Sequence, residues 1–189
     1  MKKILSLVLA VMMIVSMAAC SNTPANTTTA PKVEVPANAL EILTKLWGTV
    51  TEKFPVMGGD YETMVDGNPG TVNVKTPDFL TSTLLVPETE LAKITDAASL
   101  VHGMMLNNLT CGVFRVGSAN AAAFADAMHT AVAGNRWMCG MPEKMVIAIV
   151  GGEYVLMMFG INDALKGLET GLASVYPDAV VKYNEAITG

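Results

Sequence analysis

Histidine and cysteine are scarce in this chain, and acidic residues outnumber basic ones. Its 189 residues include two histidines, three cysteines, 12 lysines and arginines, and 17 aspartates and glutamates. The formal net charge of −5 and the lack of a basic stripe argue against nucleic acid as a partner. The lack of a basic cluster also argues against electrostatic docking onto anionic lipid.

Common catalytic and phosphate-binding motifs are also missing. The chain has no Gly-x-Ser-x-Gly elbow, His-Glu-x-x-His pair, glycine-rich phosphate loop or Cys-x-x-Cys pair. Only His102 and His129 could act as bases near neutral pH, and neither stands in an evident triad pattern. The acids are scattered, and Asp60 with Glu62 lacks the spacing of a calcium loop, so we interpret these acids as solvated charges. We therefore expect no enzyme, no cofactor and no metal, and structural or surface roles for both histidines.

The first 20 residues have the anatomy of an export signal. Lys2 and Lys3 form a positive region, Ile4 to Met17 is apolar, and two alanines precede Cys20. The apolar run is shorter than the roughly 20 residues that span a bilayer. The ending Met-Ala-Ala-Cys resembles the lipobox of bacterial lipoproteins, in which the cysteine is lipidated and begins the mature chain. We expect a signal peptide over residues 1–19 and lipidation of Cys20; a plain secretory signal is the alternative.

A tether and one domain follow the signal. Residues 20–37 are rich in threonine, asparagine, alanine and proline and cannot build a core. Loss of Lys2 and Lys3 with the signal would make the formal charge of −5 more negative by two. Residues 38–189 have the length of one ordinary domain with a sizeable core. We expect the tether to hold this domain clear of the membrane.

Helical spacing of apolar residues predicts four helices. They are an N-terminal helix that begins at Asn38 and ends before Pro55, a short helix from Pro87, a helix over Ala119 to Ala133, and a last helix capped by Asn162 or Asp163. Asn38 and Glu41 match a capping box. The third helix has the apolar stripe Ala121, Phe124, Ala125, Met128 and Val132.

A pair of predicted strands precedes each of the two later helices. Residues 99–106 and 109–116 flank Asn107-Asn108, and residues 144–150 and 153–159 flank Gly151-Gly152. The sequence therefore predicts an α+β fold. Its antiparallel or mixed sheet is built from two ββα units with helices packed mainly on one face, plus the N-terminal helix.

The second hairpin is expected to have two apolar faces. A two-residue turn at Gly151-Gly152 pairs Val150 with Glu153, and both faces of the resulting ladder are then apolar. A sheet with one wet face would alternate with polar residues. We expect the N-terminal helix or the segment over residues 57–77 to cover the second face. The alternative is an exposed apolar face that binds a protein partner or a second copy.

Sulfur-containing residues raise two further hypotheses. An exported location permits a disulfide between Cys111 and Cys139, and two buried thiols are the alternative. Within NRWMCGMPEKM, residues 135–145, Cys139 with Met138, Met141 and His129 would suit Cu(I). No Met-x-x-Met or Cys-x-x-Cys pattern supports that site. We therefore interpret the methionines as apolar filler that covers one end of the core.

The combined pattern resembles a known lipoprotein family. The lipobox, the Thr-rich tether, and the stretches FLTSTLLVPETELAKITDAASLV, LTCGVFRV and MVIAIVGGEYVLMMFG are similar to small uncharacterised lipoproteins of Gram-positive anaerobic bacteria, a domain-of-unknown-function group. The resemblance covers the chain from about Val35 onward. It implies an α+β lipoprotein domain and assigns no catalytic residues.

These observations lead to a hypothesis for location and role. We expect a protein anchored through Cys20 on the outer face of the cytoplasmic membrane, where it acts as a binding or envelope-interaction module. Its partners would be the membrane and a protein or second copy on an apolar sheet face. One alternative is a single-domain solute-capturing lipoprotein. Another is a small extracytoplasmic enzyme that uses Cys111, Cys139 or a histidine.

Overall fold

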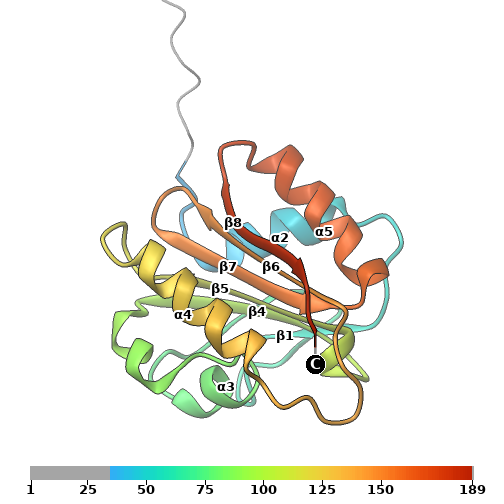
Figure 1. Ribbon diagram of the computed structural model, residues 1–189. Helices are drawn as coiled ribbons and strands as arrows, with labels where there is room; N and C mark the ends of the chain where they lie inside the picture. Colours follow the sequence, from blue (N-terminus) through green and yellow to red (C-terminus); the bar gives the residue numbers. More distant parts are fainter. Residues whose placement is uncertain (1–34, 189) are drawn as a thin grey trace, which may run out of the picture. The chain divides into compact units, whose positions relative to one another are not determined.

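The computed structural model describes residues 35–188, so the expected signal peptide, Cys20 and most of the expected tether lie outside the described residues. The domain contains an eight-stranded sheet in the order β2-β1-β4-β5-β7-β6-β8, with β3 paired to β4 (Figure 1). Every strand pair is antiparallel. The expected α+β class with an antiparallel sheet is therefore confirmed.

The elements follow in a simple order along the chain. An N-terminal helix and three short strands come first: α2 (Ala39–Thr49), β1 (Val56–Gly58), β2 (Val65–Asp66) and β3 (Gly70–Thr71). Next are α3 (Pro77–Ser82), the 3₁₀ helix η1 (Glu88–Lys93), β4 (Asp96–His102), the 3₁₀ turn η2 (Leu106–Asn108) and β5 (Leu109–Arg115). The last part contains α4 (Ala121–Ala133), β6 (Lys144–Val150), β7 (Tyr154–Gly160), α5 (Asn162–Val175) and β8 (Val180–Ala186). In residues 35–188 no helix is long and apolar enough to cross a membrane.

Hydrogen bonds at its N-terminus explain where α2 begins. The Asn38 side chain accepts a hydrogen bond from the Glu41 N–H, as the capping pattern predicts. The Glu41 carboxylate accepts instead from the Ala37 N–H, one residue outside the expected box. Asp96 at the start of β4 accepts from the Ala39 N–H at 2.6 Å. The first two bonds cap α2, and the bond to Asp96 joins its first turn to the sheet.

Helices cover both faces of the sheet, which corrects the expectation that they pack mainly on one face. α2 and α5 pack together on one face, against Leu100, Cys111, Leu156 and other buried residues. α4 packs on the opposite face with α3, against a second cluster that contains Phe114, Val155 and Met157. Figure 1 shows α2 and α5 next to each other and α4 across the sheet strands. Because β5 and β7 are apolar on both faces, helices must shield both faces of the sheet from water.

The order β4-β5-α4 and then β6-β7-α5 repeats in the chain but not as two equivalent packed units. β5 lies beside β7, so the two hairpins meet at the centre of the sheet. Their following helices then lie on opposite faces. The expected cover by the N-terminal helix is confirmed for the α5 face. The alternative of an exposed apolar face on β6 and β7 is wrong, because the apolar side chains of both strands are buried or, for Ile149, half-buried.

The register of the second hairpin differs from the expected one by one residue. Its turn has three residues, so Val150 pairs with Tyr154 instead of Glu153. Gly151 and Gly152 both have positive φ, 59° and 77°, which this turn requires. A one-residue shift moves every β7 side chain to the other face. Tyr154, Leu156 and Met158 therefore face α2 and α5 together with the even-numbered residues of β6.

The β1–β3 end of the sheet is held by a buried carboxylate that the sequence analysis interpreted as solvated. Asp60 is 4 % exposed. It accepts hydrogen bonds from the Glu62 and Thr63 N–H groups, the Thr63 hydroxyl and the Asn73 N–H, at 2.6–2.9 Å. Burial alone would raise the pKa of Asp60, but these donors outweigh it and hold the pKa below its ordinary value. Asp60 therefore ties together the chain between β1 and α3.

Two glycines allow β1 and β3 to meet at this end. A Cβ added to Gly58 would lie 2.2 Å from the backbone nitrogen of Gly70, and one added to Gly70 would lie 2.5 Å from the nitrogen of Gly59. No side chain fits at such distances without movement of the backbone. Glycine is therefore required by close backbone approach rather than by a turn.

Candidate functional site

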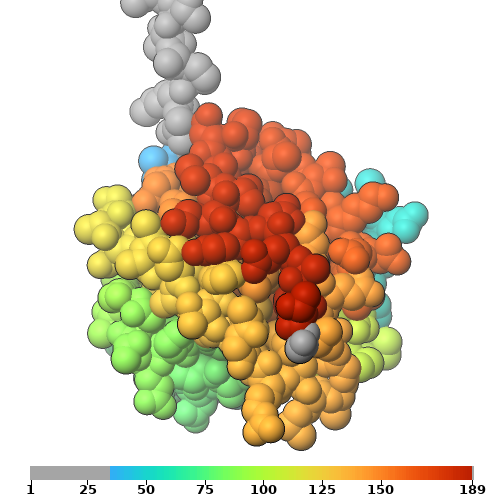
Figure 2. Space-filling model, in the orientation of Figure 1, coloured from blue at the N-terminus to red at the C-terminus, as the bar shows by residue number. Residues whose placement is uncertain are grey.

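β8 forms the opposite edge of the sheet and is mostly exposed. It pairs with β6 on one side and ends the strand order, so among residues 35–188 its outer backbone edge has no strand partner. Val180 and Val181 are 58 % and 48 % exposed. Figure 2 shows the C-terminal strand, in dark red, uncovered on the surface. We call this unpaired side of Val180–Ala186 the β8 edge.

A groove lies between β8 and α5, on the α5 face of the sheet. Its volume is about 360 Å³, and its lining comprises Val146, Glu169, Leu172, Ala173, Tyr176, Pro177, Ala179, Val181 and Asn184. The lining is mainly apolar. Glu169 is the acidic group in it and pairs with Lys144 of β6 at 2.7 Å. The groove is therefore a mainly apolar surface, and Lys144 of the same domain neutralises the charge of Glu169 in it.

An irregularity in β8 determines which side chains face α4. The pairing to β6 shifts between Ile147 and Ala148, which leaves Lys182 as an extra residue on β8. Strict alternation would place Lys182 and Tyr183 on opposite faces. Because of the bulge both reach Asp126 of α4: the Tyr183 hydroxyl donates at 2.8 Å and the Lys182 ammonium lies at 3.2 Å. The bulge therefore turns the lysine of the edge strand away from the groove.

A second set of contacts joins β8 to α4. His129 lies 2.7 Å from the Glu185 carboxylate, and its ring stacks on Tyr183 with centroids 3.9 Å apart. The hydrogen bond from Tyr183, together with Lys182, holds the pKa of Asp126 below its ordinary value. The same bond raises the pKa of Tyr183. These contacts hold β8 from the α4 side and leave its outer edge and its α5 side open.

Both histidines have structural contacts. His129 is engaged by Glu185, as described above. His102 is the last residue of β4, and its Nδ1 accepts from the N–H groups of Met104 and Met105 at 3.2 and 3.4 Å. Its ring stacks on Phe54 with centroids 5.5 Å apart. His102 therefore shapes the turn that leaves β4.

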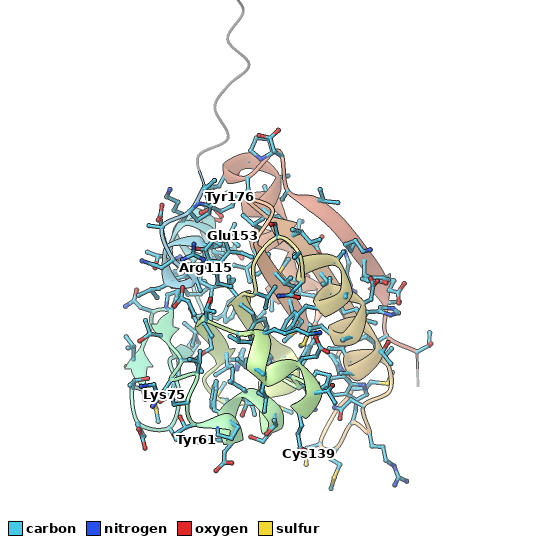
Figure 3. All side chains as sticks on the ribbon, turned by 90° about the vertical axis from the view of Figure 1, so that its left-hand side faces the viewer. Tyr61, Lys75, Arg115, Cys139, Glu153 and Tyr176 are labelled. Atoms are coloured by element: carbon cyan, nitrogen blue, oxygen red, sulfur yellow. The ribbon has the colours of Figure 1, made fainter. Side chains whose placement is uncertain are left out.

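The proposed disulfide between Cys111 and Cys139 is wrong, since both are free thiols. Cys111 lies in central strand β5 and faces the α2–α5 core, and its burial raises the pKa of its thiol. Cys139 is exposed in the loop between α4 and β6. The alternative of two buried thiols holds for Cys111 only. Figure 3 shows Cys139 at the end of the domain remote from Arg115 and Tyr176.

β8 was not predicted from the sequence, although its residues favour a strand. The run Val180-Val181-Lys182-Tyr183 has the β-branched and aromatic residues of a strand and follows Pro177. Its face pattern is obscured by the bulge. Pro36, which the sequence analysis assigned to the tether, is also part of the domain. It is buried, and its carbonyl accepts a hydrogen bond from the Tyr154 hydroxyl at 3.1 Å.

Comparisons with known proteins found no relative of this chain. No protein-family model, curated protein or solved structure matches the chain. The resemblance to small lipoproteins of anaerobic bacteria therefore stays a prediction.

Proposed function

We propose that this protein is a lipid-anchored binding module that takes an extended polypeptide on the β8 edge. The observation that carries the proposal is the unpaired, seven-residue β8 beside an apolar groove. A peptide that adds to an exposed strand gains main-chain hydrogen bonds, and alternate side chains enter neighbouring pockets. The ligand chemistry is therefore an extended segment of an envelope protein with apolar residues at alternate positions.

Three features of the edge support this role. Natural proteins shield open edges with lysine, proline or bulges, and the bulge of β8 lies in its pairing to β6, where it turns Lys182 toward α4. Here Lys182 is drawn to Asp126, so it does not guard the groove. Val181 faces the groove, and Val180 is still more exposed. The contacts of Tyr183 and Glu185 with α4 hold the strand in place before any ligand arrives, which lowers the ordering cost of binding.

The anchoring part of the proposal rests on the N-terminal sequence. Cys20 would carry the lipid, and the chain from Ser21 to Val35 would connect it to the domain on the outer face of the cytoplasmic membrane. An inhibitor of lipoprotein signal peptidase, or the substitution Cys20→Ala, is expected to leave an uncut precursor. Unchanged processing under both treatments would contradict the Cys20 assignment.

A peptide selection tests the binding role. The full chain is panned against a displayed library of random linear peptides, and selected peptides are measured by fluorescence anisotropy. We expect peptides with apolar residues at alternate positions. Since strand addition uses the peptide main chain, N-methylation of alternate amides in one register is expected to abolish binding.

Matched variants at the two sheet edges assign the site. Val181→Lys puts a charge at the groove and is expected to weaken binding at least about 10-fold, as a desolvated charge in an apolar interface does. Val65→Lys is the control, because Val65 is an exposed valine, 39 % exposed, on β2 at the other edge. Equal affinity of Val181→Lys and Val65→Lys would refute the β8 site.

A solute-capturing role is the second candidate, and the groove favours it. Its volume of about 360 Å³ is within the range of small-ligand sites. A solute that fills the groove would still be sensitive to Val181→Lys, but it would need no main-chain pairing. Binding of small solutes without any N-methyl-sensitive peptide would therefore support this role over the first.

A further inference from the structure

Five sulfur-containing side chains gather on the surface at one end of the domain. Met104 and Met138 are 78 % and 79 % exposed, Met105 and Met141 are 44 % and 48 % exposed, and Cys139 is exposed. They come from two loops, one between β4 and β5 and one between α4 and β6. We call these five residues the sulfur patch; Figure 3 labels Cys139 within it.

The exposure of these methionines is unusual for this protein. Met128, Met145, Met157 and Met158 are 0–1 % exposed, as expected for apolar side chains used in a core. Outside the sulfur patch, Met64 is the strongly exposed methionine of the described residues. The expectation that the methionines of residues 135–145 cover the core is therefore wrong for Met138 and Met141.

Hydrogen bonds hold the two loops together. The Asn107 side-chain amide donates to the carbonyl oxygens of Met138 and Gly140, at 2.9 and 2.5 Å. The Cε of Met105 lies 3.8 Å from where a Cβ on Gly140 would stand. Met105 of the first loop is therefore next to the Cys139-Gly140 segment of the second.

The second loop is also anchored on both sides of Cys139. The Trp137 ring packs on Phe159 of β7 with centroids 5.0 Å apart, and Pro142 is buried. Cys139 and Gly140 have positive φ, 61° and 110°, so the chain turns sharply between Met138 and Met141. The turn is therefore held at both ends, and it contains one exposed thiol and two exposed thioethers within four residues.

We propose that the sulfur patch is a Cu(I) site in which the Cys139 thiolate and the thioethers of Met138, Met141 and Met105 are the donors. Thiolate and thioether sulfur are the ligands that Cu(I) prefers. The patch offers sulfur rather than oxygen or imidazole, because its members are four exposed methionines and one exposed cysteine. Binding replaces the Cys139 S–H bond with an S–Cu bond and releases one proton.

The sequence spacing alone did not support this site. Met138, Cys139 and Met141 lack a repeated motif, and the candidate His129 is engaged by Glu185 on β8. The structure supplies Met105 instead, from a loop more than 30 residues earlier that Asn107 holds in place. This inference is independent of the peptide-binding role of β8.

A competition titration tests the site. The full chain, with Cys20→Ser so that Cys111 and Cys139 are its thiols, is titrated under nitrogen with Cu(I) held by bicinchoninate. We expect transfer of about one Cu(I) per chain, a sulfur-only copper shell by X-ray absorption, and weaker binding as the pH falls because a proton is released. Ag(I), a soft ion that needs no reductant, is expected to compete.

Variants assign the donors. Cys139→Ser is expected to lower the Cu(I) association constant at least about 100-fold, and Met105→Leu about 10-fold. Met64→Leu is the matched control for an exposed methionine, and Cys111→Ser is the control for a thiol; both are expected to keep wild-type affinity. Because the substituted patch residues are exposed, circular dichroism is expected to show the wild-type fold.

Three results would overturn the proposal. They are failure of the chain to withdraw Cu(I) from bicinchoninate, equal affinity of Cys139→Ser and wild type, or an equal effect of Met105→Leu and Met64→Leu. In the first case the sulfur patch would be an adaptable apolar surface for a protein partner instead of a metal site.

Discussion

The two edges of the sheet are built in opposite ways. At the β1–β3 end the strands are two or three residues long, backbones touch at Gly58 and Gly70, and the buried Asp60 accepts several hydrogen bonds. At the other end β8 is seven residues long and mostly exposed, and it is held by its pairing to β6 and by its contacts with α4. Short strands and tight loops leave no template for pairing, whereas a long unpaired strand does. The first edge is built for stability, and the second is the one to which we assign the proposed binding role.

The largest effect is expected from a substitution that disrupts the β1–β3 end of the sheet. Gly58→Ala places a Cβ 2.2 Å from the Gly70 nitrogen, so the backbones must separate. We expect a loss of about 3 kcal/mol or more in the free energy of unfolding, measured by urea denaturation. Gly48→Ala in α2 is the control, since its Cβ meets nothing within 4 Å. It is expected to stabilise by up to about 1 kcal/mol. A Gly58→Ala variant as stable as wild type would contradict the close approach.

Removal of the Asp60 charge is the next largest effect. Asp60→Asn keeps the shape but points an amide at N–H donors, and is expected to cost about 2–3 kcal/mol. Asp66→Asn, on exposed β2 at the same edge, is the control and is expected to change little.

The acid dependence of stability sharpens the Asp60 test. Its folded-state pKa lies below the ordinary value, so its contribution is present above the unfolded-state pKa of roughly 4. That contribution is lost as the pH falls through the lower, folded-state value. Urea midpoints from pH 6 to pH 2 are expected to fall less steeply for Asp60→Asn than for wild type. Parallel curves would exclude this role.

A smaller effect is expected where β8 meets α4. Tyr183→Phe removes the hydrogen bond to Asp126 but keeps the ring that stacks on His129. We expect amide hydrogen exchange to accelerate in β8 and to stay unchanged in β5 and β7, because the edge strand opens locally. Unchanged exchange in β8 would mean that its pairing to β6 holds it without the bond to Asp126.

The smallest effect is expected on the open side of β8. Val180→Thr changes a valine that is 58 % exposed, so stability should stay within about 0.5 kcal/mol of wild type. The measurement is the same urea denaturation. A loss comparable to that of Asp60→Asn would show that the β8 edge is structural, and would remove the contrast between the edges.

Periodic segments were predicted best from the sequence. The apolar stripe of α4 and the bounds of β6 were predicted correctly, because an amphipathic helix and a continuous apolar strand carry their own signal. β1, β2 and β3 were missed, since strands of two or three residues are too short to show a period. α3 and β8 were missed as well. The β7 register was wrong because the glycine pair belongs to a three-residue turn.

The candidate sites depend on contacts between distant residues, so the sequence indicated them poorly. Asp60 was interpreted as a solvated acid because its donors, such as the Asn73 N–H, are brought in by the loop fold. The bulge at Lys182 has no signature in the residues themselves. Likewise, the Asn107 side chain joins the loop of Met105 to the loop of Cys139, and the sequence around either loop does not indicate this contact.

The entry of the chain into the domain has a mechanical consequence. Pro36 is bonded to Tyr154 at the start of β7, and Ala39 is bonded to Asp96 at the start of β4. A force applied to the chain at Val35 would therefore act on β7 and β4 before it reaches the part of α2 beyond Ala39. β8 takes no part in these two bonds, so tension on the N-terminal segment would not act directly on a polypeptide bound at β8.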